Sequence, residues 1–220
     1  MKHLEWTILA SIVLAAIISW LAIPAIVRIS KSKNLVAKVT SRTSHEGKVP
    51  YLGGIAIFAS LAICSSLFAK HGLTREFQFV LPALLIIFFI GLKDDIVDVN
   101  SITKFVGQII ASMIVIVLAD VRITSFHGIL GINDIGVFVS ISLSLLVFLC
   151  VINAFNLIDG IDGLASGLGI QISMVFGFWL TFLQQHDYAI LAFSLTGGLI
   201  PFYFYNVFIH SFFCPPFFRL

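Results

Sequence analysis

A polar segment, NAFNLIDGIDGL at residues 153–164, lies between two apolar runs and carries the side chains best suited to chemistry. Its amides and carboxylates recur at steps of three residues: Asn153, Asn156, Asp159 and Asp162. Glycines at 160 and 163 follow the two aspartates, so they end helical structure and expose backbone groups. A loop that merely ends two helices would not need this spacing. Such a set can hydrogen-bond a uracil or a sugar and also face a cation, and polar groups between apolar runs indicate function.

A second acidic cluster, KDDIVD at residues 93–98, follows an earlier apolar run. Asp94 and Asp98 are four residues apart, so a helix would place them on one face. Three carboxylates this close, with Asp95 between them, repel one another unless a positive charge lies among them. Magnesium bound to phosphates would supply it, because hard cations prefer oxygen ligands. A solvated helix end explains the same residues, and prenyl-diphosphate enzymes also use a DDxxD pattern.

Basic residues accompany both clusters. Lys104 begins the next apolar run, where it could hold a phosphate as a compact cation or extend toward lipid headgroups. Gln108 lies one helical turn further on and could support it. Earlier, HEGKVPYLGG at residues 45–54 offers His45 and Lys48 to an anionic ligand, and its paired glycines permit close approach. A turn that enters a helix explains this last segment equally well.

Composition indicates the elements that must position these residues. The chain is 59% hydrophobic with 11% charged residues, and its mean hydropathy is +1.08. That is far more apolar than a soluble domain. No basic block suggests a nucleic-acid partner, and no CxxC pair suggests a disulfide framework or a zinc site. We expect Cys64 and Cys150, which fall inside apolar runs, to be buried packing residues.

Seven apolar segments approach or exceed the length needed to cross a bilayer. They cover residues 6–28, 51–69, 77–93, 103–119, 136–155, 166–183 and 187–206. The fold class predicted is therefore all-α: a polytopic transmembrane bundle of about seven helices, one integral-membrane domain over residues 1–220. The third segment is the least secure, because Pro82 lies early in it. The connection near residues 120–136 is expected to form a short hairpin in which His127 is solvated.

Loop charges predict the orientation of the bundle. One side carries eight lysines and arginines: Arg28, Lys31, Lys33, Lys38, Arg42, Lys48, Lys93 and Lys104. The other side carries four: Lys2, Lys70, Arg75 and Arg122. Basic loops stay in the cytoplasm, so the first side is expected to be cytoplasmic and the N-terminus outside. This orientation places both acidic clusters at the cytoplasmic face.

Three patches in this order resemble the polyprenyl-phosphate N-acetylhexosamine-1-phosphate transferases of glycosyltransferase family 4. They are HEGKVPYLGG at 45–54, DDIVDVNSITKFVGQ at 94–108 and NAFNLIDGIDGLASG at 153–167. The resemblance covers residues 20–206 and is nearest to the undecaprenyl-phosphate N-acetylglucosaminyl 1-phosphate transferase branch. That branch begins cell-envelope polysaccharides such as the O-antigen of lipopolysaccharide.

The resemblance implies transfer of N-acetylglucosamine 1-phosphate from a UDP-sugar to undecaprenyl phosphate, with release of UMP. It implies a multi-pass protein of the bacterial inner membrane with a cytoplasmic active face, no nucleic-acid partner, and compatibility with a homodimer. Magnesium, replaceable by manganese, would be held by Asp94, Asp95 and Asp159. Asp94 would also be the base, and Lys104 would hold the lipid phosphate. The remaining candidates would bind or place the nucleotide sugar: Asp162, Asn153, Asn156, Asp98, His45 and Lys48.

The end of the chain departs from the family. Members continue through further helices, with a GDxGS-type segment whose aspartate ligates magnesium and a later His-rich loop. Residues 209–220, IHSFFCPPFFRL, do not resemble that continuation, so the family's main magnesium-ligating aspartate is expected to lie beyond Leu220. The expectation is therefore a C-terminally truncated member, with little or no activity as these 220 residues alone. Two alternatives remain open at this stage: an intramembrane prenyltransferase that releases diphosphate, and a non-catalytic membrane binding protein.

Overall fold

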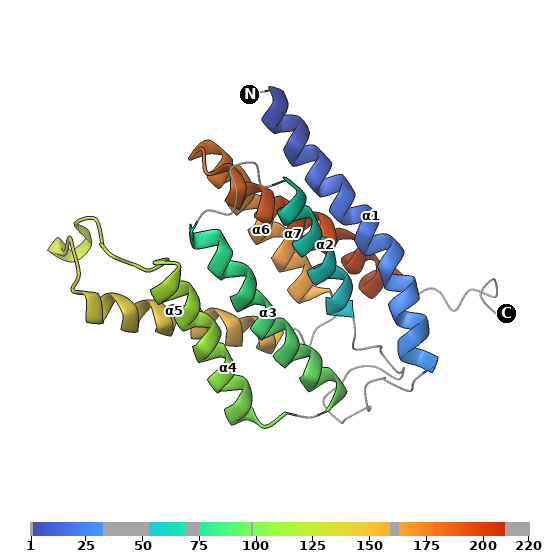
Figure 1. Ribbon diagram of the computed structural model, residues 1–220, viewed down its shortest axis with the longest axis horizontal. Coiled ribbons are helices and arrows are strands. Elements are labelled where there is room, and N and C mark those ends of the chain that lie inside the picture. Colours follow the sequence, from blue (N-terminus) through green and yellow to red (C-terminus); the bar gives the residue numbers. More distant parts are fainter. Residues whose placement is uncertain (1, 33–52, 69–74, 98, 159–162, 210–220) are drawn as a thin grey trace. The chain divides into compact units, whose positions relative to one another are not determined.

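The computed structural model describes residues 2–32, 53–68, 75–97, 99–158 and 163–209 (Figure 1). Within these ranges the chain is helical, and its α-helices are α1 (Lys2–Ser32), α2 (Gly53–Phe68), α3 (Arg75–Ile96), α4 (Ser101–Met113), α5 (Val137–Ile158), α6 (Leu164–Phe182) and α7 (His186–Phe204). Short π-helical turns continue α4 and α7, as η1 (Ile114–Leu118) and η3 (Tyr205–Ile209), and η2 (Ile129–Gly131) is a 3₁₀ turn. Each predicted apolar segment coincides with one α-helix, so the all-α prediction is confirmed.

Five helical stretches in the described ranges are long and apolar enough to cross a membrane. They are Glu5–Ser30, Ser101–Leu118, Val137–Ile158, Leu164–Phe182 and His186–Val207. The apolar helix α2 is shorter, and α3 carries charged residues at both ends. The chain is therefore a multi-pass membrane protein, while a membrane-crossing role for α2 and α3 stays a prediction.

The chain divides into two compact units. The first contains α1, α2, α6 and α7, and the second contains α3, α4, η1 and η2 together with α5 up to Leu157. In the first unit α7 packs against α1, α2 and α6. Its glycines permit close approach: a Cβ atom on Gly197 would collide with the carbonyl oxygen of Ile12, and one on Gly198 with Ser60. Ser19 also donates a hydrogen bond to the Gly198 carbonyl, at 2.8 Å. Small residues and hydroxyls thus hold these helices together, as is common in membranes.

This packing predicts opposite effects for two glycine substitutions in the first unit. Gly197→Ala should lower the unfolding temperature, because its new methyl group meets backbone of α1 that cannot rotate away. Such overpacking costs about 1–3 kcal/mol. That cost outweighs the roughly 1 kcal/mol that alanine gains over glycine in a helix. Thermal unfolding in detergent, followed by tryptophan fluorescence, measures the shift.

Gly54→Ala is the matched control, since nothing lies within 4 Å of its new Cβ atom. It should leave the unfolding temperature unchanged or raise it. Equal shifts for the two variants would contradict the close contact between α7 and α1.

In the second unit α3 and α4 run in opposite directions and pack together (Figure 1). Gly107 of α4 meets the side chain of Ile90 on α3, so the helices approach closely there. The connection to α5 is fixed by hydrogen bonds. Arg122 pairs with Asp120 at 2.7 Å and donates to Ser140 of α5 at 3.1 Å. One turn further along α5, the Ser144 hydroxyl accepts from the backbone N–H of residue 123 at 2.9 Å. These contacts attach the first half of α5 to the end of η1.

The predicted hairpin is present in a minimal form. Ser125 and Asp134 form an isolated antiparallel bridge, and the N–H of Phe126 donates to the carbonyl of Asn133 at 2.9 Å. His127 is exposed at its turn with a φ of 52°. The prediction that His127 is an exposed loop residue is confirmed.

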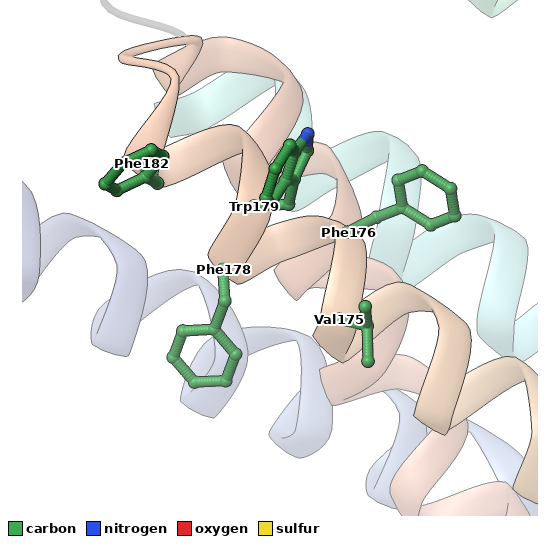
Figure 2. Close-up of a pocket in the computed structure, with 5 residues that line it drawn as sticks. All are labelled: Val175, Phe176, Phe178, Trp179 and Phe182. Atoms are coloured by element: carbon green, nitrogen blue, oxygen red, sulfur yellow. The ribbon is translucent and has the colours of Figure 1, made fainter.

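Apolar side chains also cover the outer surfaces of the helices. Figure 2 shows five that line a shallow, open hollow on the last turns of α6. They are Val175, Phe176, Phe178, Trp179 and Phe182, all exposed. Cys64 is buried in α2 as expected, but Cys150 is exposed on α5, so its expected burial is wrong. The reason is physical: a membrane helix is apolar on its lipid side too, so apolar neighbours do not show which face is buried.

Candidate functional site

The acidic cluster and Lys104 meet where α3 leads into α4. The Nζ atom of Lys104 lies 2.5 Å from Oδ2 of Asp94, and the two side chains are 38% and 31% exposed. The other carboxylate oxygen, Oδ1, accepts the backbone N–H of Val99 at 3.1 Å. Asp94 of α3 is therefore fixed by one contact from the turn, through Val99, and by one from α4, through Lys104. Both groups are still accessible enough to meet a ligand.

Local sequence explains this arrangement. Asp94 lies in the last turn of α3, next to the negative end of the helix dipole, where an acid is unfavourable without a cation nearby. Lys104 supplies that cation. The Asn100 side chain caps α4 by accepting the N–H of Ile102 at 3.2 Å, which starts the new helix within a few residues. Lys104 then lies in the second turn of α4, within reach of the end of α3.

A second contact joins α4 to α5. The Oε1 atom of Gln108 accepts a hydrogen bond from Nδ2 of Asn153 at 3.0 Å. The same Nδ2 also donates to the carbonyl of Leu149 at 2.8 Å. Gln108 is buried, with 7% of its surface exposed. Two residues that the sequence placed in different motifs are therefore in direct contact.

The remaining predicted residues are placed only in part. Asp95 is half-buried in the last turn of α3, and Asn156 is exposed in the last turn of α5. Gly163 begins the next described segment with a φ of 71°, which suits the predicted break before α6. Around its backbone, Val207 and Tyr203 leave no room for a side chain. The other candidates lie outside the described residues: His45, Lys48, Asp98, Asp159 and Asp162.

The end of the chain is likewise outside the described residues. The last described residue is Ile209, and Leu220 belongs to the segment that follows it. The structure therefore does not test the expectation that the family's main magnesium-ligating aspartate lies beyond Leu220. That expectation stays a prediction.

A metal site needs more donors than the described residues provide. Within the described parts of the chain, no three His, Cys, Asp or Glu side chains lie together in a position to hold a metal. Asp94 and Asp95 supply the hard oxygen atoms that magnesium prefers, and they are adjacent at the end of α3. Of the three predicted ligands, Asp159 falls outside the described ranges. The donor chemistry fits magnesium, and the complete ligand set stays a prediction.

Sequence reasoning missed two pairings. It assigned Lys104 to a phosphate and Asp94 to a metal, but did not foresee that they form an ion pair. Their opposite charges on either side of a short turn were the available signal. It also treated Gln108 as a support for Lys104, whereas the described partner of Gln108 is Asn153.

Comparison with known proteins gives a consistent result. The sequence model of glycosyl transferase family 4 matches residues 77–214, more than half of the chain. A relative from Escherichia coli (strain K12), an undecaprenyl-phosphate alpha-N-acetylglucosaminyl 1-phosphate transferase, is 28% identical over an alignment of 185 residues. The alignment covers 82% of this chain and 49% of the relative. The decaprenyl-phosphate N-acetylglucosaminephosphotransferase of Mycobacterium leprae (strain TN) is 31% identical over 79% of this chain and 46% of its own length.

The corresponding protein of Mycobacterium tuberculosis (strain ATCC 25618 / H37Rv) is 33% identical over 71% of this chain and 41% of its own length. The chain thus spans about half the length of the curated relatives that it matches. The matched region contains α4, α5 and all but the first residues of α3. It therefore includes the Asp94–Lys104 ion pair and the Gln108–Asn153 hydrogen bond. On this evidence the chain belongs to glycosyl transferase family 4.

Proposed function

We propose that this protein takes part in transfer of N-acetylglucosamine 1-phosphate from UDP-N-acetylglucosamine to a polyprenyl phosphate such as undecaprenyl phosphate. An oxygen of the lipid phosphate attacks the sugar-bearing phosphorus, the bond from that phosphorus to UMP breaks, and UMP leaves. The products are UMP and a polyprenyl diphosphate-linked sugar. The observation that carries the proposal is the half-exposed Asp94–Lys104 pair in a member of a family whose relatives are named for this transfer.

The two members of the pair suit the two charges of this reaction. Phosphoryl transfer depends mainly on positioning and charge neutralisation. Lys104 would turn from Asp94 to the lipid phosphate, which carries more negative charge than a carboxylate. Asp94 would then be free to accept a proton from that phosphate and to bind a cation with its released oxygen. The ion pair therefore keeps Asp94 and Lys104 charged and in position in the absence of substrate.

Magnesium fits the same donors. Asp94 and Asp95, with Asp159 from the segment that follows α5, would hold it, and bound magnesium would offset the negative charge on the diphosphate of the UDP-sugar. Asn153, Asn156 and Asp162 are proposed to bind the nucleotide sugar. Three further residues are proposed to contribute to substrate binding: His45, Lys48 and Asp98. The site is proposed to face the cytoplasm of a bacterial inner membrane, where UDP-sugars are available.

The experiment uses membranes from cells that express the protein from its complete gene. Labelled UDP-N-acetylglucosamine and undecaprenyl phosphate are added, and labelled lipid and UMP are measured together. We expect both products in equal amounts, their loss with EDTA, and their return with added magnesium. Release of diphosphate in place of UMP would point to prenyl transfer. Absence of lipid product with every UDP-N-acetylhexosamine would refute the proposal.

The orientation can be tested separately by cysteine labelling. Ser32, at the end of α1, and Gln185, between α6 and α7, are both exposed and lie on opposite sides of the proposed topology. In intact cells a cysteine at 185 should react with a membrane-impermeant maleimide. A cysteine at 32 should react only after the cells are opened. The reverse pattern would place the acidic clusters away from cytoplasmic UDP-sugars.

A further inference from the structure

The hydrogen bond between Gln108 and Asn153 joins a residue with no role in the chemistry proposed above, Gln108, to one that is assigned to the nucleotide sugar. Gln108 is buried on a helix that is apolar enough to cross a membrane. A buried amide is costly in such surroundings unless it is hydrogen-bonded. Asn153 satisfies its oxygen at 3.0 Å. Separating the two residues would leave this oxygen unpaired, so the contact resists movement of α5 away from α4.

The position of Gln108 on α4 links this contact to Lys104. The two residues are four apart, so they share a helix face and lie about 6 Å apart along the axis. From that face Lys104 reaches Asp94 of α3, and Gln108 reaches Asn153 of α5. One helix therefore fixes two others through neighbouring side chains.

On α5 the contact lies close to the residues assigned to the nucleotide sugar. Asn156 follows Asn153 by nearly one turn, and the DGIDG segment follows directly in the sequence. Among the described residues, α5 makes its other hydrogen bonds to the rest of the second unit near its start, at Ser140 and Ser144. In the part of the chain that the structure describes, the Gln108 contact is thus the hydrogen bond that holds the end of α5.

We propose that Gln108 is a positioning residue, which holds Asn153 so that the end of α5 keeps a fixed place relative to Asp94 and Lys104. This inference rests on the proposed function, because Gln108 would fix the distance between the residues assigned to the lipid phosphate and those assigned to the nucleotide sugar. Loss of the Gln108 side chain should therefore lower kcat. The side chain of Gln108 takes no part in the Lys104–Asp94 pair, so binding of the lipid phosphate should be preserved when Gln108 is changed.

Kinetics test this role with Gln108→Leu and Asn153→Leu. Each should lower kcat by roughly tenfold to a hundredfold, the size of effect expected from misplacing reacting groups by about an ångström. The KM for polyprenyl phosphate should stay within about twofold, and the double variant should be no slower than the slower single one. Gln108→Glu retains an oxygen that accepts the Asn153 N–H, so it should recover most of the lost rate.

Ser112→Ala is the matched control. Ser112 is buried one turn beyond Gln108 on the same face of α4, and its hydroxyl has no partner among the described residues. Its kcat should equal that of the wild-type protein. A drop in kcat as large as that of Gln108→Leu would show that any polar-to-apolar change on this face slows the enzyme, and would overturn a specific role for Gln108.

A distance measurement tests the contact without relying on activity. Spin labels are attached to cysteines at Phe105 of α4 and Leu157 of α5, which are 48% and 83% exposed, after the native cysteines are replaced with alanine. Electron paramagnetic resonance should give a narrow distance distribution that broadens in Gln108→Leu and Asn153→Leu but not in Ser112→Ala. Gln108→Asn, which is too short to reach Asn153, replaces the leucine variant if that fails to fold.

The two measurements separate the possible failures. An unchanged distance distribution in the Gln108 and Asn153 variants would overturn the positioning role, whatever the transfer rates. A raised KM for polyprenyl phosphate with normal kcat would overturn it too, because Gln108 would then act through Lys104. Distances that broaden in the variants of a protein that shows no transfer activity even as wild type would refute the proposed function, although the hydrogen bond would still hold α5 in place.

Discussion

Replacing Asp94 with asparagine should lower the rate of lipid-linked sugar formation by roughly a hundredfold or more, as expected when a charge stabiliser is removed from an active site. The asparagine side chain has nearly the same size and shape as that of aspartate. The asparagine oxygen can still accept the N–H of Val99, so the turn between α3 and α4 is retained. What is lost is the negative charge that pairs with Lys104 and that is proposed to accept a proton and bind magnesium.

Stability should not account for this loss. Asp94 lies at the negative end of the α3 dipole, where a neutral amide is better tolerated than an unpaired acid. Ion pairs this exposed contribute about 0–1 kcal/mol. Initial rates of lipid product, normalised to the amount of protein in the membrane, therefore report on catalysis.

Asp120→Asn is the matched control for Asp94→Asn. Asp120 also pairs with a cation in the second unit, Arg122, but its side chain is 73% exposed and lies at the end of η1. Its φ of 54° is a conformation that asparagine adopts readily. The control should keep the wild-type rate. If Asp94→Asn were as fast as this control, Asp94 would have no role in transfer and the proposed function would lose its main support.

The positions of the helices were predictable from the sequence because each helix is an apolar run. The residues at which the helices end were less predictable. The third run was expected to end at residue 93, where charge begins, yet α3 continues to Ile96. Helical backbone hydrogen bonds can continue beyond the apolar segment. The N–H of Val97 still donates to the carbonyl of Lys93 at 2.8 Å. Hydropathy marks the edge of the membrane, whereas the end of a helix depends on its capping residues.

The residues of the site were also predictable, but not their contacts. Asp94, Lys104 and Asn153 stand out because polar groups are costly in apolar surroundings. Whether Lys104 reaches Asp94 depends on the turn between α3 and α4, whose geometry the sequence does not specify. Gln108 and Asn153 are 45 residues apart, so their contact depends on how α5 is placed beside α4. Sequence spacing within one helix cannot give that register.

The side chain of Lys104 should determine how tightly the lipid phosphate binds. We expect Lys104→Gln to raise the KM for polyprenyl phosphate by roughly tenfold to a hundredfold, because a hydrogen bond to a charged group contributes about 1.5–3 kcal/mol. The KM for UDP-N-acetylglucosamine should change little. Lys104→Arg keeps the charge on a larger, planar group, so its effect should be intermediate.

Lys93→Gln is the control for this prediction, because Lys93 is an exposed lysine directly before Asp94. Removing its charge alters the electrostatics of the same helix end without removing the partner of Asp94. Its kinetic constants should match those of the wild-type protein, whereas Lys104→Gln should show weak binding of one substrate only. If Lys104→Gln instead raised the KM for UDP-N-acetylglucosamine and left that for the lipid unchanged, Lys104 would belong to the nucleotide-sugar side of the site. The carboxylate of Asp94 would then face the diphosphate of the UDP-sugar, where it could not act as the base that deprotonates the attacking lipid phosphate.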